Sequence, residues 1–383
     1  MHDLLIVGAG PVGLSLALAL RGTGLHVALA DTRPRTAVTE DPRVLALAHG
    51  TRLTLERLGV WPQLPATAIR HIHISQQGGF GRTRLDAGDY DLPALGYVLA
   101  AGALAGALRQ AVDAAGIPVM DETEVTALKP GTEQVEISLA GPGSAVHGSH
   151  CTARLVACAE GGLQPDTEGV VTRDYDQHAL IGRVAVQADH GQVAFERFTS
   201  EGPIALLPYG KDYALVHVVP AGRAAELLAL DDRAYLARLQ TAFGTRVQFT
   251  AIRDRQRFPL GLRYRRDPVG QRTVWLGNAA QTLHPVAGQG FNLALRDVWA
   301  LSQALAEHPG DPGAAGTLEA YRNNRRLDRF GAIHFTDSLV RIFSNDVGPL
   351  HHARGAALFA LDMLPPLRHF IARRMMFGAR AWL

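Results

Sequence analysis

Cysteine is scarce in this chain, since only Cys151 and Cys158 occur among 383 residues. Two thiols cannot build the disulfide framework of a secreted scaffold, and their separation of seven positions suits neither a CxxC redox pair nor a metal cluster. The disulfide-reductase class of redox enzymes is therefore excluded. We interpret both cysteines as small core residues.

Long apolar segments are lacking as well. The stretch from Leu4 to Leu20 carries no charge, but it is shorter than the ~20 residues that span a bilayer, and it contains three glycines and a proline. His2 and Asp3 do not form the basic start of a secretion signal. We therefore expect a cytoplasmic protein.

Neither charge is in excess. Lysine plus arginine number 38 against 36 acidic residues, a formal net charge of +2, so no nucleic-acid partner is indicated. His71 and His73 share one face of a strand expected at 69–75, but no third ligand is nearby, so no metal site is predicted. The length allows roughly two domains.

The first informative segment, residues 3–31, predicts a strand, a glycine turn, a helix from Pro11 to about Arg21, and a second strand that ends in Asp31. In this dinucleotide fingerprint Gly8 makes the turn, Gly10 lets a pyrophosphate approach, and Gly13 permits close packing of helix on sheet. Asp31 stands where a ribose hydroxyl needs an acceptor. The alternative is a glycine-rich turn in an unrelated α/β protein.

The second segment, GNAAQTLHPVAGQGFNLALRDV at 277–298, places Gly277, Gly288 and Gly290 around His284-Pro285 and starts an amphipathic helix at Phe291-Asn292. Glycines let a backbone contact a flat cofactor, and the free N–H groups of a helix start favour an electron-rich edge such as that of a reduced flavin. A tight turn before a surface helix is the alternative.

The pattern along the chain indicates a discontinuous α/β protein. We expect a loop and helix at 41–61 with Leu53, Leu55, Leu58 and Val60 buried, a helix at 97–116, an antiparallel sheet over 178–260, and helices over 318–383. The predicted regions are a Rossmann-like nucleotide-binding domain (1–75, 97–177 and 268–325), an inserted substrate-binding β-sheet domain (76–96 and 178–267) and a C-terminal helical region (326–383).

Three motifs in this order and spacing carry a family likeness: the N-terminal fingerprint, ERFTSEGPIALLPY at 196–209, and the segment 277–298. From residue 3 to about 330 the chain resembles the FAD-dependent hydroxylases of ubiquinone biosynthesis. The run Asn278-Ala279-Ala280-Gln281 makes it most similar to the type that hydroxylates 2-polyprenyl-6-methoxyphenol.

The resemblance implies the aromatic-hydroxylase (p-hydroxybenzoate hydroxylase-like) fold and an FAD monooxygenase. NAD(P)H would reduce the flavin, O2 would add to it, and the flavin C4a-hydroperoxide would transfer an oxygen atom to a polyprenylated phenol. The alternatives are another ring hydroxylase of the pathway, a prenyl-chain reductase, and a non-catalytic flavoprotein-like subunit of a lipid-biosynthetic assembly.

The same resemblance assigns cofactor contacts. It implies that the fingerprint binds the ADP half of FAD and that Arg43 approaches the flavin side. It further implies that Asn278 lies by the pyrophosphate and ribityl chain and that the loop after Pro285 lines the isoalloxazine ring. The full set is Gly8, Gly10, Pro11, Val12, Gly13, Asp31, Arg43, Glu160, Gly277, Asn278, Pro285, Gly288, Gln289, Gly290, Phe291 and Asn292.

One motif departs from the family, which usually has Gly-Ala-Asp-Gly followed by a serine. This chain has Cys158-Ala159-Glu160-Gly161, with Gln164 at the serine position. A cysteine at a tight turn and a longer acid put FAD affinity and reactivity with nicotinamide in doubt.

Candidates for catalysis are few. His284 titrates in a range that suits proton transfer from a phenol, although it can equally serve only to shape the loop. Tyr209 is a candidate wall of the substrate pocket. Glu196, Arg197 and Phe198 match a family motif, but cross-strand pairing explains them as well, and no step is assigned to them.

The C-terminal segment 354–383 combines five arginines with one acid and many large apolar residues. We expect it either to contact an anionic membrane peripherally, to dock on other ubiquinone-biosynthesis proteins, or to cover the enzyme's own core.

Overall fold

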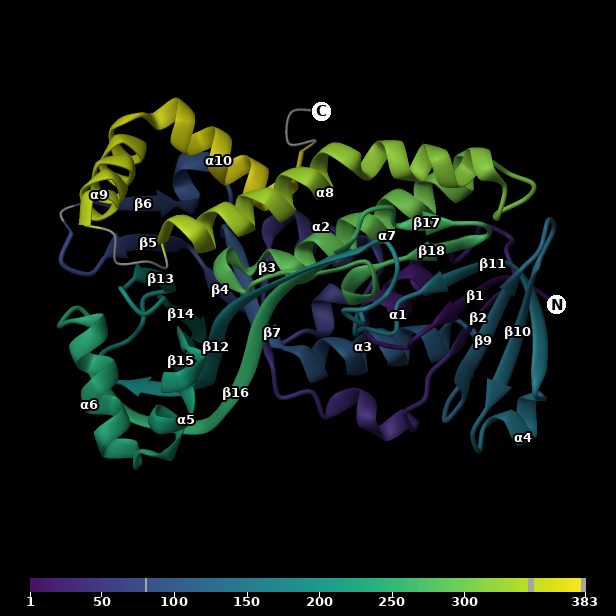
Figure 1. Cartoon of the computed structure of the whole chain (residues 1–383), viewed down its shortest axis with the longest axis horizontal. Coiled ribbons are helices and arrows are strands. Elements are labelled where there is room, and N and C mark those ends of the chain that lie inside the picture. Colours follow the sequence, from purple (N-terminus) through teal and green to yellow (C-terminus); the bar gives the residue numbers. More distant parts are fainter. Residues whose placement is uncertain (80, 344–347, 380–383) are drawn as a thin grey trace.

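The computed structural model describes residues 1–79, 81–343 and 348–379. Two eight-stranded sheets lie at opposite ends of an elongated molecule, and the longest helices run between them (Figure 1). A three-stranded sheet connects the two ends.

The first sheet carries the glycine fingerprint that the sequence predicts to bind a nucleotide. Its central strands are parallel and apolar, as expected for strands that are buried on both faces. The strand order is β17 (Val269–Gly270), β18 (Thr273–Trp275), β11 (His150–Cys158), β1 (His2–Val7), β2 (Val27–Ala30) and β8 (Val119–Met120). Strand β10 (Val135–Ala140) also pairs with β11, and β9 (Glu124–Pro130) pairs with β10.

The second sheet is mostly antiparallel. Its order is β19 (Gln281–Thr282), β16 (Phe249–Arg265), β12 (Val170–Val186), β15 (Asp212–Pro220), β14 (Pro203–Tyr209), β13 (Val193–Phe198), β5 (His71–Gln76) and β6 (Arg82–Asp86). One pair, β5 with β13, is parallel. The strands begin at residues 71 and 170, earlier than the expected boundaries at 76 and 178. The division into domains itself stays a prediction.

The third sheet corrects two helix predictions. Strands β3 (Val44–Ala48), β7 (Gly96–Ala100) and β4 (Thr67–Ile69) pair antiparallel in that order. The segment 41–61 therefore holds a strand before its helix, and the helix expected from 97 begins only at Ala101. Leu53, expected to be buried, is exposed, whereas Leu55, Leu58 and Val60 are buried as expected.

Helices cover the sheets and fill the space between them. Those of the nucleotide-binding end are α1 (Pro11–Ala19), α2 (His49–Arg57), α3 (Ala101–Ala114), α4 (Ser144–His147) and α7 (Gln289–Glu307). The second sheet carries α5 (Ala221–Ala229) and α6 (Asp232–Phe243), and the C-terminal region forms α8 (Ala315–Phe343), α9 (Gly348–Met363) and α10 (Pro365–Phe377).

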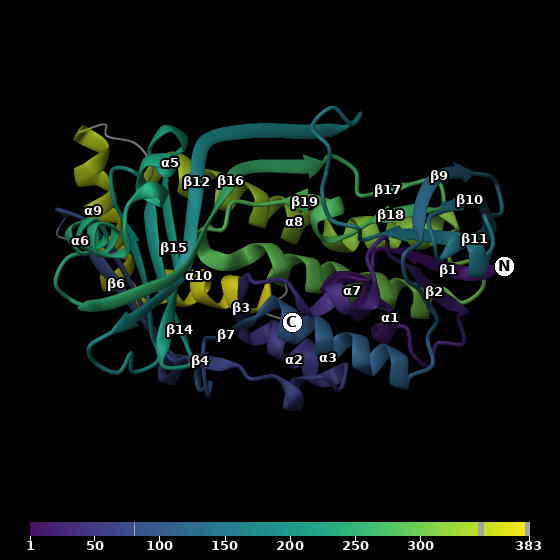
Figure 2. The ribbon, with the colours of Figure 1, turned by 90° about the horizontal axis from the view of Figure 1, so that it is seen from below.

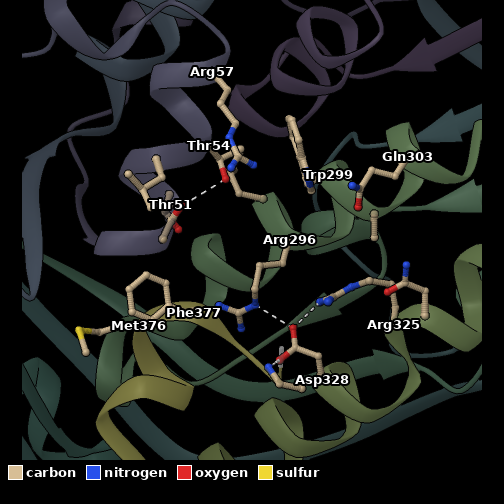
Figure 3. A pocket seen from close by; sticks show the side chains of 16 residues that line it. Thr51, Thr54, Arg57, Arg296, Trp299, Gln303, Arg325, Asp328, Met376 and Phe377 are labelled. Atoms are coloured by element: carbon tan, nitrogen blue, oxygen red, sulfur yellow. Dashed lines mark hydrogen bonds and ion pairs between the residues drawn. The ribbon is translucent and has the colours of Figure 1, made fainter. Parts of the chain in front are cut away.

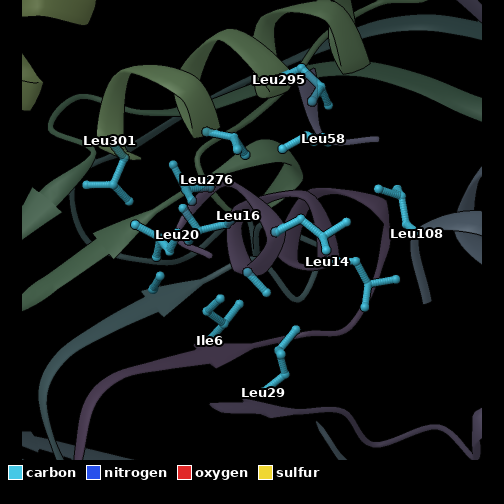
Figure 4. Packing of buried hydrophobic residues seen from close by; sticks show 14 of the residues in the cluster. Ile6, Leu14, Leu16, Leu20, Leu29, Leu58, Leu108, Leu276, Leu295 and Leu301 are labelled. Atoms are coloured by element: carbon cyan, nitrogen blue, oxygen red, sulfur yellow. The ribbon is translucent and has the colours of Figure 1, made fainter. Parts of the chain in front are cut away.

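Helix α1 has no polar face, and other elements of the protein surround it. Leu14 and Leu16 are fully buried, and α1 packs against α3 and α7 as well as strand β1 (Figure 4). A helix without a polar face belongs in the interior of a protein. The charge-free stretch Leu4–Leu20 is thus the centre of the largest core.

Candidate cofactor and substrate site

Four parallel strands end at one edge of the first sheet, and the predicted cofactor residues follow them. The glycine turn follows β1, Asp31 follows β2, Glu160 lies two residues after β11, and Gly277 follows β18. Ligands of such sheets bind outside the carboxyl ends of the strands. The fold therefore brings together residues that are up to 269 positions apart in the chain.

The three fingerprint glycines have different contacts. A Cβ on Gly8, where φ is +103°, would lie 2.6 Å from the Glu160 Cα, and one on Gly13 would lie 2.0 Å from the Gly8 carbonyl oxygen. Gly10 has only an Arg33 guanidinium nitrogen nearby, at 3.9 Å. Packing thus requires Gly8 and Gly13, while Gly10 leaves space before the helix.

The start of α1 is open to an anion. Pro11 occupies its first turn, and no side chain caps the free backbone N–H groups there. A Cβ on Gly277 would lie 3.0 Å from Val12, so the turn at Gly277 packs onto this helix start and brings the exposed Asn278 to it.

Asp31 is buried and already ordered. Its carboxylate accepts hydrogen bonds from the Ala9 amide at 2.6 Å and from the backbone and guanidinium of Arg33. Burial alone would raise the pKa of Asp31, but these hydrogen bonds outweigh it, and the pKa is lowered. The sequence reasoning missed Arg33, whose signal is a basic residue two positions after the ribose-binding acid.

Arg43 lies just before β3 and is engaged locally. Its guanidinium forms paired hydrogen bonds with Asp41, and the Arg43 side chain is 55% exposed. The structure does not direct it to the loop at 285–292, so its approach to the flavin stays a prediction.

Cys158, which stands where the family usually has glycine, lies in the core and not in the tight turn. Cys158 is the last residue of β11, paired with Val7 and Trp275, and burial raises the pKa of its thiol to about 12. The residues with positive φ are Gly161 and Gly162. The tight turn therefore follows Glu160, and the thiol is an inert core group.

The predicted flavin loop packs closely on β3. Gly288 has φ of +58°, and a Cβ there would lie 3.2 Å from the Ala46 side chain. By contrast, no atom lies within 4 Å of the position a Cβ would take on Gly290. The first turn of α7 thus leaves open space beside Gly290, and Pro285 and Phe291 nearby in the chain are half-buried.

Asn292 is a clamp inside this loop. Its buried amide oxygen accepts hydrogen bonds from the Ala48 amide (2.8 Å) and the Thr51 hydroxyl (2.7 Å). Its amide nitrogen donates to the carbonyls of Ala46 and Gly288. All four hydrogen-bonding positions of the side chain are used, so Asn292 positions the loop. Gln289, the first residue of α7, is also buried.

His284 is buried in front of Pro285. Its Nδ1 accepts a hydrogen bond from the Val286 amide at 3.2 Å, and Tyr175 approaches the ring edge-on at 5.6 Å. Burial lowers the pKa of His284 to about 4. With so low a pKa the ring is a weak proton acceptor, which favours the role of shaping the loop over that of a base.

Tyr209 ends strand β14 and belongs to a cluster with Val44 and Val98 of the connecting sheet. Its hydroxyl accepts a hydrogen bond from Arg183 at 3.0 Å, and that guanidinium lies 4.5 Å from the ring centre. Tyr209 thus faces the nucleotide-binding end, where a wall of the substrate pocket is expected.

A buried polar network fastens the loop to α8. Asp297 accepts hydrogen bonds from Gln281 and Arg325, both at 2.7 Å, and Gln281 in turn accepts one from Arg329 at 2.7 Å. All four side chains are buried. Sequence reasoning did not find this network, because its partners are 16 to 48 positions apart and form no local motif.

A separate pocket of about 290 Å³ lies behind the loop, between α2, α7, α8 and α10 (Figure 3). Arg57 lies over the Trp299 ring, and Arg296 and Arg325 both contact Asp328. None of the predicted cofactor residues lines this pocket. We do not assign it to the flavin.

Buried histidines predict how stability depends on pH. Burial lowers the pKa of His73, His217 and His284 to about 4, from 6.5, whereas burial raises the pKa of Glu196 to about 7. Between pH 6.5 and 4.5 the unfolded chain therefore binds three protons that the folded chain does not, and the folded chain binds one on Glu196. Stability should fall with falling pH by about 3 kcal/mol per unit from these groups.

Urea unfolding at pH 7.5, 6.5, 5.5 and 4.5 measures this slope. His217→Gln removes one of the three histidines and should roughly halve it. Equal stability at pH 6.5 and 4.5 would contradict the assignment.

Comparison with known proteins agrees with this geometry. Residues 1–334 match the model of a family described as FAD binding domain. The chain belongs to the FAD binding domain family. Among the described residues, no group of three or more histidines, cysteines or acids is placed to hold a metal ion.

Relatives match over nearly the whole chain. Ubiquinone hydroxylase UbiL of Rhodospirillum rubrum is 31% identical, with 98% of this chain and 89% of the relative covered. The 3-demethoxyubiquinol 3-hydroxylase of Escherichia coli is 29% identical over 94% of each chain. This FAD binding domain protein is accordingly an FAD-dependent monooxygenase for which NAD(P)H is the reductant.

Solved structures confirm the aromatic-hydroxylase fold. The p-nitrophenol 4-monooxygenase PnpA of Pseudomonas putida superposes with a TM-score of 0.75 at 16% identity, covering 99% of both chains. PqsL of Pseudomonas aeruginosa, a probable FAD-dependent monooxygenase, has a TM-score of 0.72 at 21% identity, covering 94% of this chain and 99% of its own.

The residues present fit FAD. Open space at Gly10 and Gly290 and the uncapped start of α1 offer room and N–H donors. When bound and reduced, FAD supplies the activation of O2 for transfer of one oxygen atom to an aromatic ring.

Proposed function

We propose that this chain hydroxylates 2-polyprenyl-6-methoxyphenol in ubiquinone biosynthesis. The relatives named as ubiquinone hydroxylases support the pathway. The observation that carries a ring substrate is the apolar contact between the second sheet and the flavin loop, where Phe198 and Ile74 cluster with Val286. Such a surface can hold a phenol ring and exclude water.

Different residues of the chain would bind the cofactor, shape the loop and bound the substrate. Gly10, Asp31 and Asn278 would hold the adenine-nucleotide part of FAD, and the open first turn of α7 would receive the flavin ring. His284 would keep the loop in shape, while Tyr209 would bound the ring substrate from the opposite sheet. Another ring position stays the alternative, because the Escherichia coli relative is named for a 3-hydroxylation.

Mass spectrometry of the quinone-pathway lipids in a deletion strain tests this proposal. Accumulation of 2-polyprenyl-6-methoxyphenol, rescued by the wild-type gene and not by Gly10→Trp, is the expected result, because the indole would fill the pyrophosphate space. A different accumulating phenol would move the assignment to another ring position. Rescue by both genes would favour a non-catalytic subunit.

We further propose that the C-terminal helices contact a membrane surface. Ten large apolar side chains are exposed in the described part of the chain, and eight of them lie between Leu327 and Phe370 on α8 to α10 and the turn between the last two. Arg326 and Arg373 are exposed on the same helices. Apolar and basic side chains together suit a peripheral site on anionic lipid. No helix among the described residues is long and apolar enough to cross a bilayer.

Flotation with vesicles of phosphatidylcholine and phosphatidylglycerol checks this surface. Met363→Glu combined with Leu367→Glu should weaken binding about tenfold or more, because two exposed apolar side chains become charged. Leu53→Glu, on α2, is the matched control and should leave binding unchanged. Equal flotation of wild type and the double variant would exclude this contact.

A further inference from the structure

Glu196 is an acid whose place in strand β13 sets it apart from its neighbours. Side chains alternate along a strand. Arg197 points to the face covered by α6, where it donates hydrogen bonds to the Ala242 carbonyl and the Ser75 hydroxyl. Glu196 is therefore on the opposite face and is not paired with Arg197.

That opposite face points to the nucleotide-binding end. Two residues before Glu196, Ala194 clusters with Val98 of the connecting sheet, and two residues after it, Phe198 clusters with Val286 of the flavin loop. Positions i−2, i and i+2 of a strand share one face. The Glu196 side chain thus enters the layer between the two domains, beside the loop expected to hold the flavin.

The surroundings of Glu196 are apolar. Its register neighbours are Ile74 on β5 and Ala205 on β14. The Glu196 side chain is half-buried, and no described residue forms a hydrogen bond or ion pair with its carboxyl group. A half-buried carboxyl group in apolar surroundings loses part of its hydration and has no protein partner to replace it, so its presence needs a reason other than stability.

The titratable groups on the elements around this face do not pair with Glu196. They are Arg183 and Tyr209 on the sheet, His284 on the flavin loop, Tyr175 on β12, Asp337 on α8 and Arg354 on α9. Burial alone raises the pKa of Glu196 to about 7, and no charge contributes to the shift. A carboxyl group with this pKa exchanges its proton near neutral pH, as a general base requires.

We propose that the Glu196 carboxylate accepts the proton of the substrate's ring hydroxyl, an inference that rests on the proposed function. The O–H bond of the phenol breaks, its electron pair stays on the phenol oxygen, and the proton forms an O–H bond on Glu196. The phenolate ring is richer in electrons and is attacked more readily by electrophilic oxygen. The proton returns to solvent after the ring is hydroxylated.

Glu196→Gln keeps the shape and removes the base. We expect kcat to fall about 100-fold and the pH profile of kcat/KM to lose its rise through pH 7. Glu196→Asp should retain that rise with a lower kcat. Glu201→Gln is the matched control, because Glu201 is exposed and pairs with Arg223, and it should behave as wild type. An unchanged pH profile in Glu196→Gln would overturn the assignment.

A binding measurement separates this proposal from the choice of substrate. Calorimetric titration with 2-methoxyphenol should show affinity rising about tenfold between pH 6 and 8, in wild type and Glu201→Gln but not in Glu196→Gln. If this dependence is found while 2-polyprenyl-6-methoxyphenol is not hydroxylated, the substrate proposal fails and Glu196 keeps its role. If wild type and Glu196→Gln bind alike at every pH, the role of Glu196 is wrong.

Thermal melting separates a catalytic from a structural role. Above pH 7, Glu196→Gln should melt no lower than wild type, because the amide replaces a charge in an apolar layer. A lower melting temperature together with wild-type pH profiles would make Glu196 a structural residue only.

Discussion

Replacing Gly13 by alanine should destabilise the fold by about 3 kcal/mol or more and abolish FAD binding. The new Cβ would lie 2.0 Å from the Gly8 carbonyl oxygen, and both atoms belong to the turn that joins β1 to α1. Neither can move without pulling the helix start away from the sheet edge. Thermal melting of the FAD-free protein and titration with FAD measure the two effects.

Gly10→Ala is the matched control within the same turn. Its Cβ would meet only a guanidinium nitrogen of Arg33, at 3.9 Å, which is an ordinary van der Waals distance. The FAD-free variant should melt as wild type does, even if FAD binds less tightly. Similar melting temperatures for Gly13→Ala and wild type would show that the turn adapts, contrary to this account.

Replacing Asp297 by leucine should cost about 3–5 kcal/mol. Asp297 is buried and accepts hydrogen bonds from Gln281 and Arg325, so its loss leaves a buried guanidinium and a buried amide with fewer partners. Arg325 would keep only its contact with Asp328, which Arg296 shares. Urea unfolding gives the loss in free energy.

The control for Asp297 is Asp267→Asn, which breaks an ion pair with Arg322 in which both partners are exposed. Exposed pairs contribute at most about 1 kcal/mol. A comparable loss in the two variants would mean that burial does not set the value of the network.

The sequence could predict the cofactor edge because its physics is local. A glycine turn, an apolar strand and a terminal acid each act within about 30 residues, and parallel strands then bring Gly8, Asp31 and Gly277 to one edge without further information. The structure shows that the Asn292 side chain forms hydrogen bonds with β3, which no local pattern indicated, and its contact with the flavin ring stays a prediction.

The connecting sheet could not be predicted, because two of its strands run directly into helices. VLALA at 44–48 is rich in alanine and leucine and continues into α2, and GYVLA at 96–100 continues into α3. Periodicity cannot separate a short apolar strand from the start of a helix. Pairing with a partner some 50 residues away decides the outcome.

Sequence also undervalued Glu196. In the sequence, Glu196 and Arg197 are simply neighbouring opposite charges on one strand. Their surroundings differ only because different elements pack on the two faces of the sheet. Arg197 meets α6, whereas Phe198, which shares its face of the strand with Glu196, meets the flavin loop. That difference depends on which helices and loops return to each face of the sheet.

The two 17-residue strands β12 and β16 pair along almost their full length and extend from the second sheet toward the first (Figures 1 and 2). The paired strands form a continuous two-stranded connection between the two ends of the molecule. Cutting the chain at either strand would leave its partner an unprotected sheet edge that invites aggregation. We therefore expect the two halves, produced as separate fragments, to aggregate.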